Sequence, residues 1–193
     1  MTQNGALSKN MRLLGQHDLG GFGNVGEGMA IQLARDGRRV LWLGHESAPK
    51  NFTAVDVTDP RKPSVIVQTN LPHGDMRSNN LDLVGDLLVV PYQTARVGMQ
   101  PAGVEFFDVT DPGKPRSVAF FDASGPHSRG VHHLWFVDGS SLHLASGARR
   151  GPAEWPSPRR SCRSRPDRDG PGAACSSRGH RSVSWLFSLG PGS

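Results

Sequence analysis

Short apolar runs separated by turn residues dominate the first three quarters of the chain. Such runs predict half-buried β-strands, and a Gly-Asp or Asp-Gly dipeptide between two runs predicts a tight hairpin turn. Residues 52–145 show no convincing 3.6-residue period of an amphipathic helix. The runs come in pairs, each joined by such a dipeptide: 29–33 with 40–43, 81–84 with 87–90, and 134–137 with 142–145.

A nine-residue motif occurs twice, 52 residues apart, as VDVTDPRKP at 55–63 and FDVTDPGKP at 107–115. Its second Asp, Asp59 or Asp111, is expected to accept turn hydrogen bonds, and the proline that follows fixes φ. Each repeat unit therefore predicts four antiparallel strands, A to D: the two strands of the hairpin, a third that enters the motif and a fourth after it. This arrangement and this period are typical of a β-propeller blade.

The motif, two apolar residues followed by Asp-Val-Thr-Asp-Pro-x-Lys-Pro, resembles the LVIVD repeat of bacterial proteins predicted to be β-propellers. The resemblance covers roughly residues 11–148 and implies a fold rather than a reaction. The chain departs from the family because it holds only two full motifs. We therefore expect an all-β fold, an incomplete β-propeller of about two and a half four-stranded blades, after a flexible N-terminus at 1–10.

The composition changes abruptly near residue 149. Residues 149–193 hold nine Arg, nine Ser, six Pro and six Gly, which predicts a disordered tail. The third unit lacks its copy of the motif, and GC-rich DNA read out of frame commonly yields such a composition. We therefore hypothesise a frameshift or misassigned end, so that the chain is a fragment. Translating the other two frames past residue 148 should then reveal another Asp-x-x-Asp-Pro motif.

The basic charge belongs to this tail. The whole chain carries +5 and the tail +6, which leaves −1 for residues 1–148. Nucleic acid is therefore not the expected partner, and Cys162 and Cys175 have no second pair that would indicate a zinc site or a disulfide framework. No stretch approaches 18 apolar residues, so we expect a cytoplasmic protein without a membrane segment. The open sides of an incomplete ring predict self-association or aggregation.

Polar residues collect on one predicted face, where the long B–C and D–A loops meet. The first functional hypothesis is a non-catalytic scaffold that binds a protein or a small-molecule ligand there. The residues expected to contact the ligand are Arg77, Asn79, Asn80 and Arg129.

The second hypothesis is a metal-dependent propeller enzyme. Six of the eight histidines fall in the long loops or at the start of strand A, and imidazole suits zinc, copper or iron. The expected ligands of a transition metal ion at the channel mouth are His17, His45, His73, His127, His132 and His133. Alternatively, these side chains bond to the backbone in irregular turns. The residues name no reaction, so whether the protein is an enzyme stays open.

A third hypothesis follows from Gly21-Phe-Gly23-Asn-Val-Gly26, which satisfies the G-x-G-x-x-G pattern of dinucleotide-binding Rossmann proteins. It requires a helix over 27–36 and a second strand over 39–44. The context argues against it, because polar residues precede the first glycine where a buried strand is needed, and no βαβ alternation follows.

Overall fold

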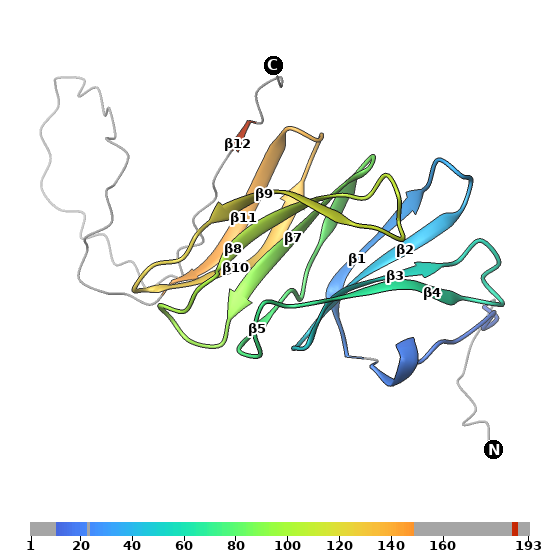
Figure 1. The fold of residues 1–193 in the computed structure, drawn as a ribbon, viewed down its shortest axis with the longest axis horizontal. Helices are drawn as coiled ribbons and strands as arrows, with labels where there is room; N and C mark the ends of the chain where they lie inside the picture. The colour runs from blue at the N-terminus through green and yellow to red at the C-terminus, as the bar shows by residue number, and fades with distance from the viewer. Residues whose placement is uncertain (1–10, 23, 149–186, 189–193) are drawn as a thin grey trace, which may run out of the picture.

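A computed structural model describes residues 11–22, 24–148 and 187–188 (Figure 1), and this part of the chain is all-β, as predicted. Its one helical segment is the short 3-10 turn η1 (Leu19–Gly21). No helix in these ranges is long and apolar enough to span a membrane. The flexible N-terminus predicted at 1–10 and almost all of the predicted tail lie outside the described residues.

The first repeat unit is a four-stranded antiparallel sheet whose strands lie side by side in chain order. Its second strand begins one residue before the predicted run 40–43 and ends two residues after it, whereas its first strand ends with the run 29–33 but begins four residues earlier. The strands are β1 (Val25–Leu33), β2 (Arg39–His45), β3 (Lys50–Asp56) and β4 (Ser64–Asn70).

The second unit repeats this order, with a short extra strand paired to the far end of its second strand. Its strands are β5 (Met76–Arg77), β6 (Asp82–Val84), β7 (Leu87–Thr94), β8 (Gly103–Asp108) and β9 (Arg116–Asp122). Both complete units are thus the four-stranded antiparallel arrangement that the repeat predicts.

The third unit contains the hairpin β10 (Ser128–Phe136) and β11 (Ser141–Ala148). The other edge of β11 pairs with the two-residue strand β12 (Phe187–Ser188) from the predicted tail. A single residue pair, Gly130 with Gln93, joins β10 to β7, so the second and third units form one hydrogen-bonded sheet. Figure 1 shows the three units in sequence, from the blue-green strands of the first to the orange strands of the third.

The repeated aspartates stabilise turns, as predicted. Asp59 accepts from the Arg61 N–H at 3.0 Å, and Asp111 accepts from the Gly113 N–H at 2.9 Å. Asp108, at the end of β8, accepts from the backbone N–H of Thr110, and this bond, with Thr110 and Arg116 side chains, lowers the pKa of Asp108 to about 2. Asp108 therefore has a structural role, because its charged carboxylate accepts a hydrogen bond from a backbone N–H group.

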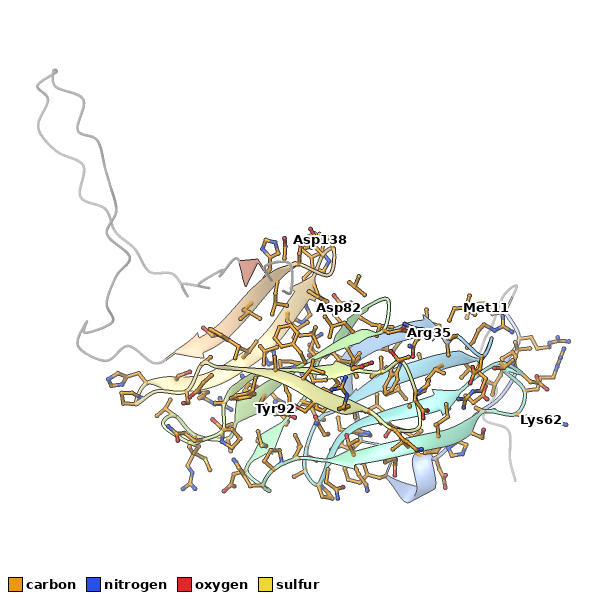
Figure 2. All side chains as sticks on the ribbon, turned by 45° about the horizontal axis from the view of Figure 1, so that its top comes forward. Met11, Arg35, Lys62, Asp82, Tyr92 and Asp138 are labelled. Atoms are coloured by element: carbon orange, nitrogen blue, oxygen red, sulfur yellow. The ribbon has the colours of Figure 1, made fainter. Side chains whose placement is uncertain are left out.

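Two hydrophobic cores hold the three units together. The first lies between units one and two, where Phe52 contacts Trp42 and Phe107 edge-on at ring-centroid distances of 5.7 and 5.0 Å. The second lies between units two and three, where Phe106 and Phe136 pack at 6.3 Å. Side chains from all three units fill these spaces in Figure 2.

The glycine-rich segment does not begin a helix, so the Rossmann hypothesis is wrong. The segment from Val25 to Leu33 is strand β1, where that hypothesis needs a helix. A Cβ on Gly26 would lie 2.3 Å from the Asn79 carbonyl oxygen, and one on Gly28 would lie 2.2 Å from the Leu81 nitrogen. These glycines therefore let two units approach closely; the middle glycine, Gly23, is outside the described residues.

Candidate functional site

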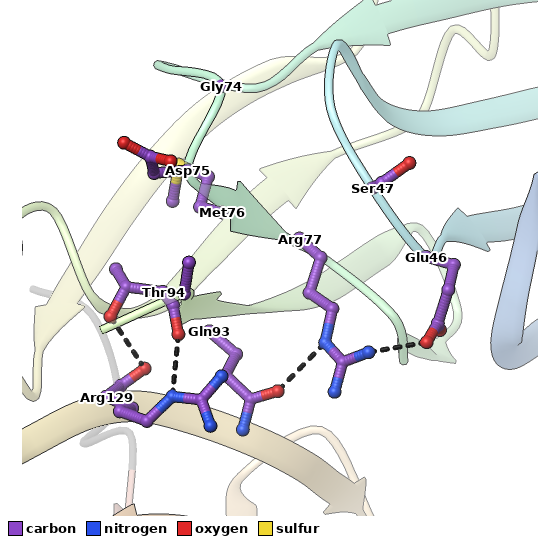
Figure 3. Close-up of a pocket in the computed structure, with 10 residues that line it drawn as sticks. Glu46, Ser47, Gly74, Asp75, Met76, Arg77, Gln93, Thr94 and Arg129 are labelled. Atoms are coloured by element: carbon purple, nitrogen blue, oxygen red, sulfur yellow. Dashed lines mark hydrogen bonds and ion pairs between the residues drawn. The ribbon is translucent and has the colours of Figure 1, made fainter. Parts of the chain in front are cut away.

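The long loops of successive units meet around a cavity of about 370 Å³ (Figure 3). Its walls come from the segment after β2, the segment around β5, the end of β7 and the start of β10, so all three units contribute. This is the face on which the sequence predicts a ligand site. The lining residues are Glu46, Ser47, Gly74, Asp75, Met76, Arg77, Gln93, Thr94, Ala95 and Arg129.

Arg77 connects the first two units at the wall of this cavity. Its Nη1 donates to Glu46 at 2.5 Å, and its Nε donates to the Gln93 Oε1 at 2.9 Å. Its side chain is 30% exposed, so the guanidinium is partly desolvated. The ion pair with Glu46 neutralises Arg77 and fixes the plane of its guanidinium.

Arg129 enters the cavity from β10, 52 residues after Arg77. Its Nε donates to the Thr94 carbonyl at 2.8 Å, and the Thr94 hydroxyl donates to the Arg129 carbonyl at 3.3 Å. Within the described residues, neither terminal nitrogen of Arg129 has a hydrogen-bond or ion-pair partner. Figure 3 shows the two guanidinium groups on either side of Gln93. The cavity thus holds one paired and one unpaired cation.

The two asparagines predicted as ligand contacts lie at junctions between units and do not line the cavity. Asn79 is 2% exposed, and its carbonyl accepts from the Gly28 N–H at 2.9 Å. The Asn80 Oδ1 accepts from the Leu134 N–H at 3.2 Å. Both side chains are buried and neither lines the cavity, so a ligand contact at Asn79 and Asn80 stays a prediction.

The predicted histidine ligands do not converge. The Nδ1 of His17 accepts from the Leu19 N–H at 2.8 Å, and the Nδ1 of His73 accepts from the Asp75 N–H at 3.1 Å. Both histidines therefore bond to the backbone in irregular turns, which is the alternative to metal binding. Across the described ranges, no group of three or more His, Cys, Asp or Glu side chains could hold a metal ion.

The histidines of the third unit also lie apart. His127 and His133 are exposed, whereas His132 is half-buried with its Nδ1 3.1 Å from the Gln93 Oε1. Because an amide oxygen only accepts, this bond requires a proton on Nδ1. A polar chain therefore runs from Glu46 through Arg77 and Gln93 to His132.

His45 is fully buried, and both of its ring nitrogens have partners. The Nδ1 lies 3.0 Å from the Asn24 carbonyl, and the Nε2 lies 2.7 Å from the Thr53 hydroxyl. The carbonyl acceptor places the proton on Nδ1, and the hydroxyl then donates to Nε2. In this arrangement His45 has no ring nitrogen left for a metal ion.

Because of His45, the folded chain should become less stable as the pH is lowered. Burial lowers its pKa, against a smaller opposing effect of the Asn24 carbonyl, so the unfolded chain binds the proton more strongly. The stabilisation is complete above the unfolded pKa of about 6.5 and is lost as the pH falls below it. We expect a lower urea midpoint at about pH 5.5 than at about pH 7.5, and a smaller difference in His45→Gln. His127→Gln, at an exposed site, should keep the wild-type difference; equal pH dependence in His45→Gln would contradict this role.

Sequence reasoning identified the two arginines but missed the groups that position them. Glu46 follows β2, and Gln93 and Thr94 end β7, so all three lie at the ends of equivalent strands. The pairing of β7 with β10 brings Gln93 beside the third unit. The repeat itself is the signal that could identify these three residues, because residues after strand B in one unit must face the start of strand A in the next.

No protein-family model matches this chain, and no curated protein matches it. The resemblance to the LVIVD repeat therefore rests on the motif residues themselves.

Proposed function

We propose that the chain is part of a β-propeller of the LVIVD-repeat type, and that its loop face is a non-catalytic binding site for a small anionic ligand. Support for the propeller comes from two four-stranded meanders, a third hairpin in the same order, and hydrophobic cores between successive units. The metal-dependent alternative has no comparable support, because its histidines are separated.

One observation carries the binding proposal: Arg77 and Arg129 occupy equivalent positions of two units and line the same cavity. This cavity, of about 370 Å³, is open to solvent. The bond from its Nε to the Thr94 carbonyl orients the Arg129 guanidinium, whose two terminal nitrogens have no partner among the described residues. An oriented guanidinium with free N–H groups fits a carboxylate or phosphate, which it binds through two parallel hydrogen bonds.

The neighbouring groups restrict which anions fit. Glu46 occupies Arg77 and would repel a second anion close to it, so the anionic group is expected at Arg129. The Gln93 amide, which also lines the cavity, offers a polar contact beside it. The site therefore favours a ligand with one carboxylate or phosphate and a polar body that reaches Gln93.

Arg129→Gln should weaken anion binding about tenfold, the effect of losing roughly 1.4 kcal/mol of charge-assisted hydrogen bonding. Titrations of the full chain with inorganic phosphate and with lactate, followed by calorimetry, measure the affinity and separate the two anion classes. Glu46→Gln should instead strengthen anion binding, because it removes the carboxylate that competes for Arg77.

Arg116→Gln is the matched control, since Arg116 is an exposed arginine paired with Asp108 away from the cavity. Its affinity for both anions should equal that of the wild type. The proposal fails if neither anion binds the wild-type chain saturably, or if Arg116→Gln and Arg129→Gln weaken binding equally.

A further inference from the structure

The outer side of the first unit presents an exposed apolar row. Met29, Ile31 and Leu33 alternate along β1, and their side chains are 64%, 60% and 76% exposed. On the same face of the sheet, Leu43 is buried in a cluster with Leu19. The β1 row itself stays exposed. A row of large apolar side chains at such exposure is a recognised mark of an interaction surface.

The equivalent rows of the other two units are buried. Leu81 and Leu83 follow Met29 and Ile31 by 52 residues and pack into the core against the first unit. Leu134 and Phe136 follow by a further 53 residues and pack against the second unit. This row is therefore the surface with which a unit contacts the unit before it.

The third unit leaves open the other kind of surface, the one with which a unit contacts the unit after it. Trp135 and Val137 are 60% and 42% exposed, and the Trp135 ring lies 5.6 Å from that of His143. The residues 53 positions earlier, Asp82 and Val84, both contact the following unit. The labelled residues Arg35, Asp82 and Asp138 show the order of the three units in Figure 2.

We propose that a second copy of this chain docks head-to-tail, with Trp135 and Val137 of one copy against Met29, Ile31 and Leu33 of the other. Within the chain these two kinds of surface already pack against each other twice, in the cores between units one and two and between units two and three. The two exposed end surfaces should therefore be complementary. Such a contact is heterologous and closes into a ring only if its rotation allows. Two copies would bring together twice the units of one chain, within the roughly four to eight blades of closed propellers.

The test uses two full-length variants, each blocking one surface: Ile31→Glu and Trp135→Glu. Both positions are exposed, so folding should persist, which circular dichroism verifies. By analytical ultracentrifugation the wild type should associate and each variant alone should be monomeric. An equimolar mixture should form a discrete one-to-one dimer, because each variant keeps the surface that the other lacks.

Val118→Glu is the control, since Val118 is 45% exposed on β9 of the middle unit, away from both end surfaces, and should associate like the wild type. Contact between two copies of the β1 row would leave Trp135→Glu associated by itself, and that result overturns the head-to-tail arrangement. A monomeric wild type, or a mixture that stays monomeric, overturns the docking itself. Phosphate binding can persist in every case, so this result is separate from that of the ligand proposal.

Discussion

Trp42→Ala should destabilise the folded chain by about 3–5 kcal/mol, the usual cost of truncating a fully buried aromatic residue. Trp42 is 0% exposed in the core between the first two units and contacts Phe52 edge-on. Its Nε1 donates to the Gln32 Oε1 at 3.0 Å, so the variant also leaves a buried amide without its donor. Loss of this size is a large part of the ~5–15 kcal/mol that holds a typical domain folded.

Urea unfolding followed by circular dichroism at one fixed protein concentration measures the effect. Trp42→Phe keeps most of the ring but loses the N–H, so its midpoint should lie between those of the wild type and Trp42→Ala. Val118→Ala, at an exposed site on β9, should change stability by less than about 0.5 kcal/mol. If Trp42→Ala unfolds at the wild-type midpoint, the packing between the first two units does not hold the fold together.

The strands and turns were predictable because their causes are local. Alternating apolar residues and a Gly-Asp or Asp-Gly dipeptide specify a hairpin wherever they occur, and Asp59 and Asp111 bond to residues two positions away. The repeat then gives the order of strands in both complete units. The tight contact of Gly26 and Gly28 with residues 79–81 was not predictable, because it joins segments about 50 residues apart.

The site was predictable only to the level of one face. Repeat spacing places Arg77 and Arg129 at equivalent positions, and both line the cavity. Which loop residues are buried depends on the packing of units, so the sequence does not reveal that Asn79 and His45 are buried. The single strand contact between β7 and β10, which positions Gln93, has no signal in either segment.

Gly28→Ala should destabilise the chain by about 3 kcal/mol, at the upper end of the cost of overpacking. The new Cβ would lie 2.2 Å from the Leu81 nitrogen and 2.5 Å from the Asn80 Cα. These are backbone atoms, so no side-chain rotation relieves the clash, and β1 must move away from the second unit. That movement also strains the bond from the Gly28 N–H to the Asn79 carbonyl. Urea unfolding measures the loss.

Gly74→Ala is the matched control, because a Cβ on Gly74 meets no atom within 4 Å. It should be neutral or stabilise the chain by up to about 1 kcal/mol, since alanine restricts the unfolded backbone. The sign of Gly28→Ala also separates the two interpretations of the glycine-rich segment. In the helix that a dinucleotide site requires, alanine at this position would stabilise by about 1 kcal/mol. A stabilised Gly28→Ala variant would therefore refute the close contact between β1 and the second unit, and with it the packing on which the order of units depends.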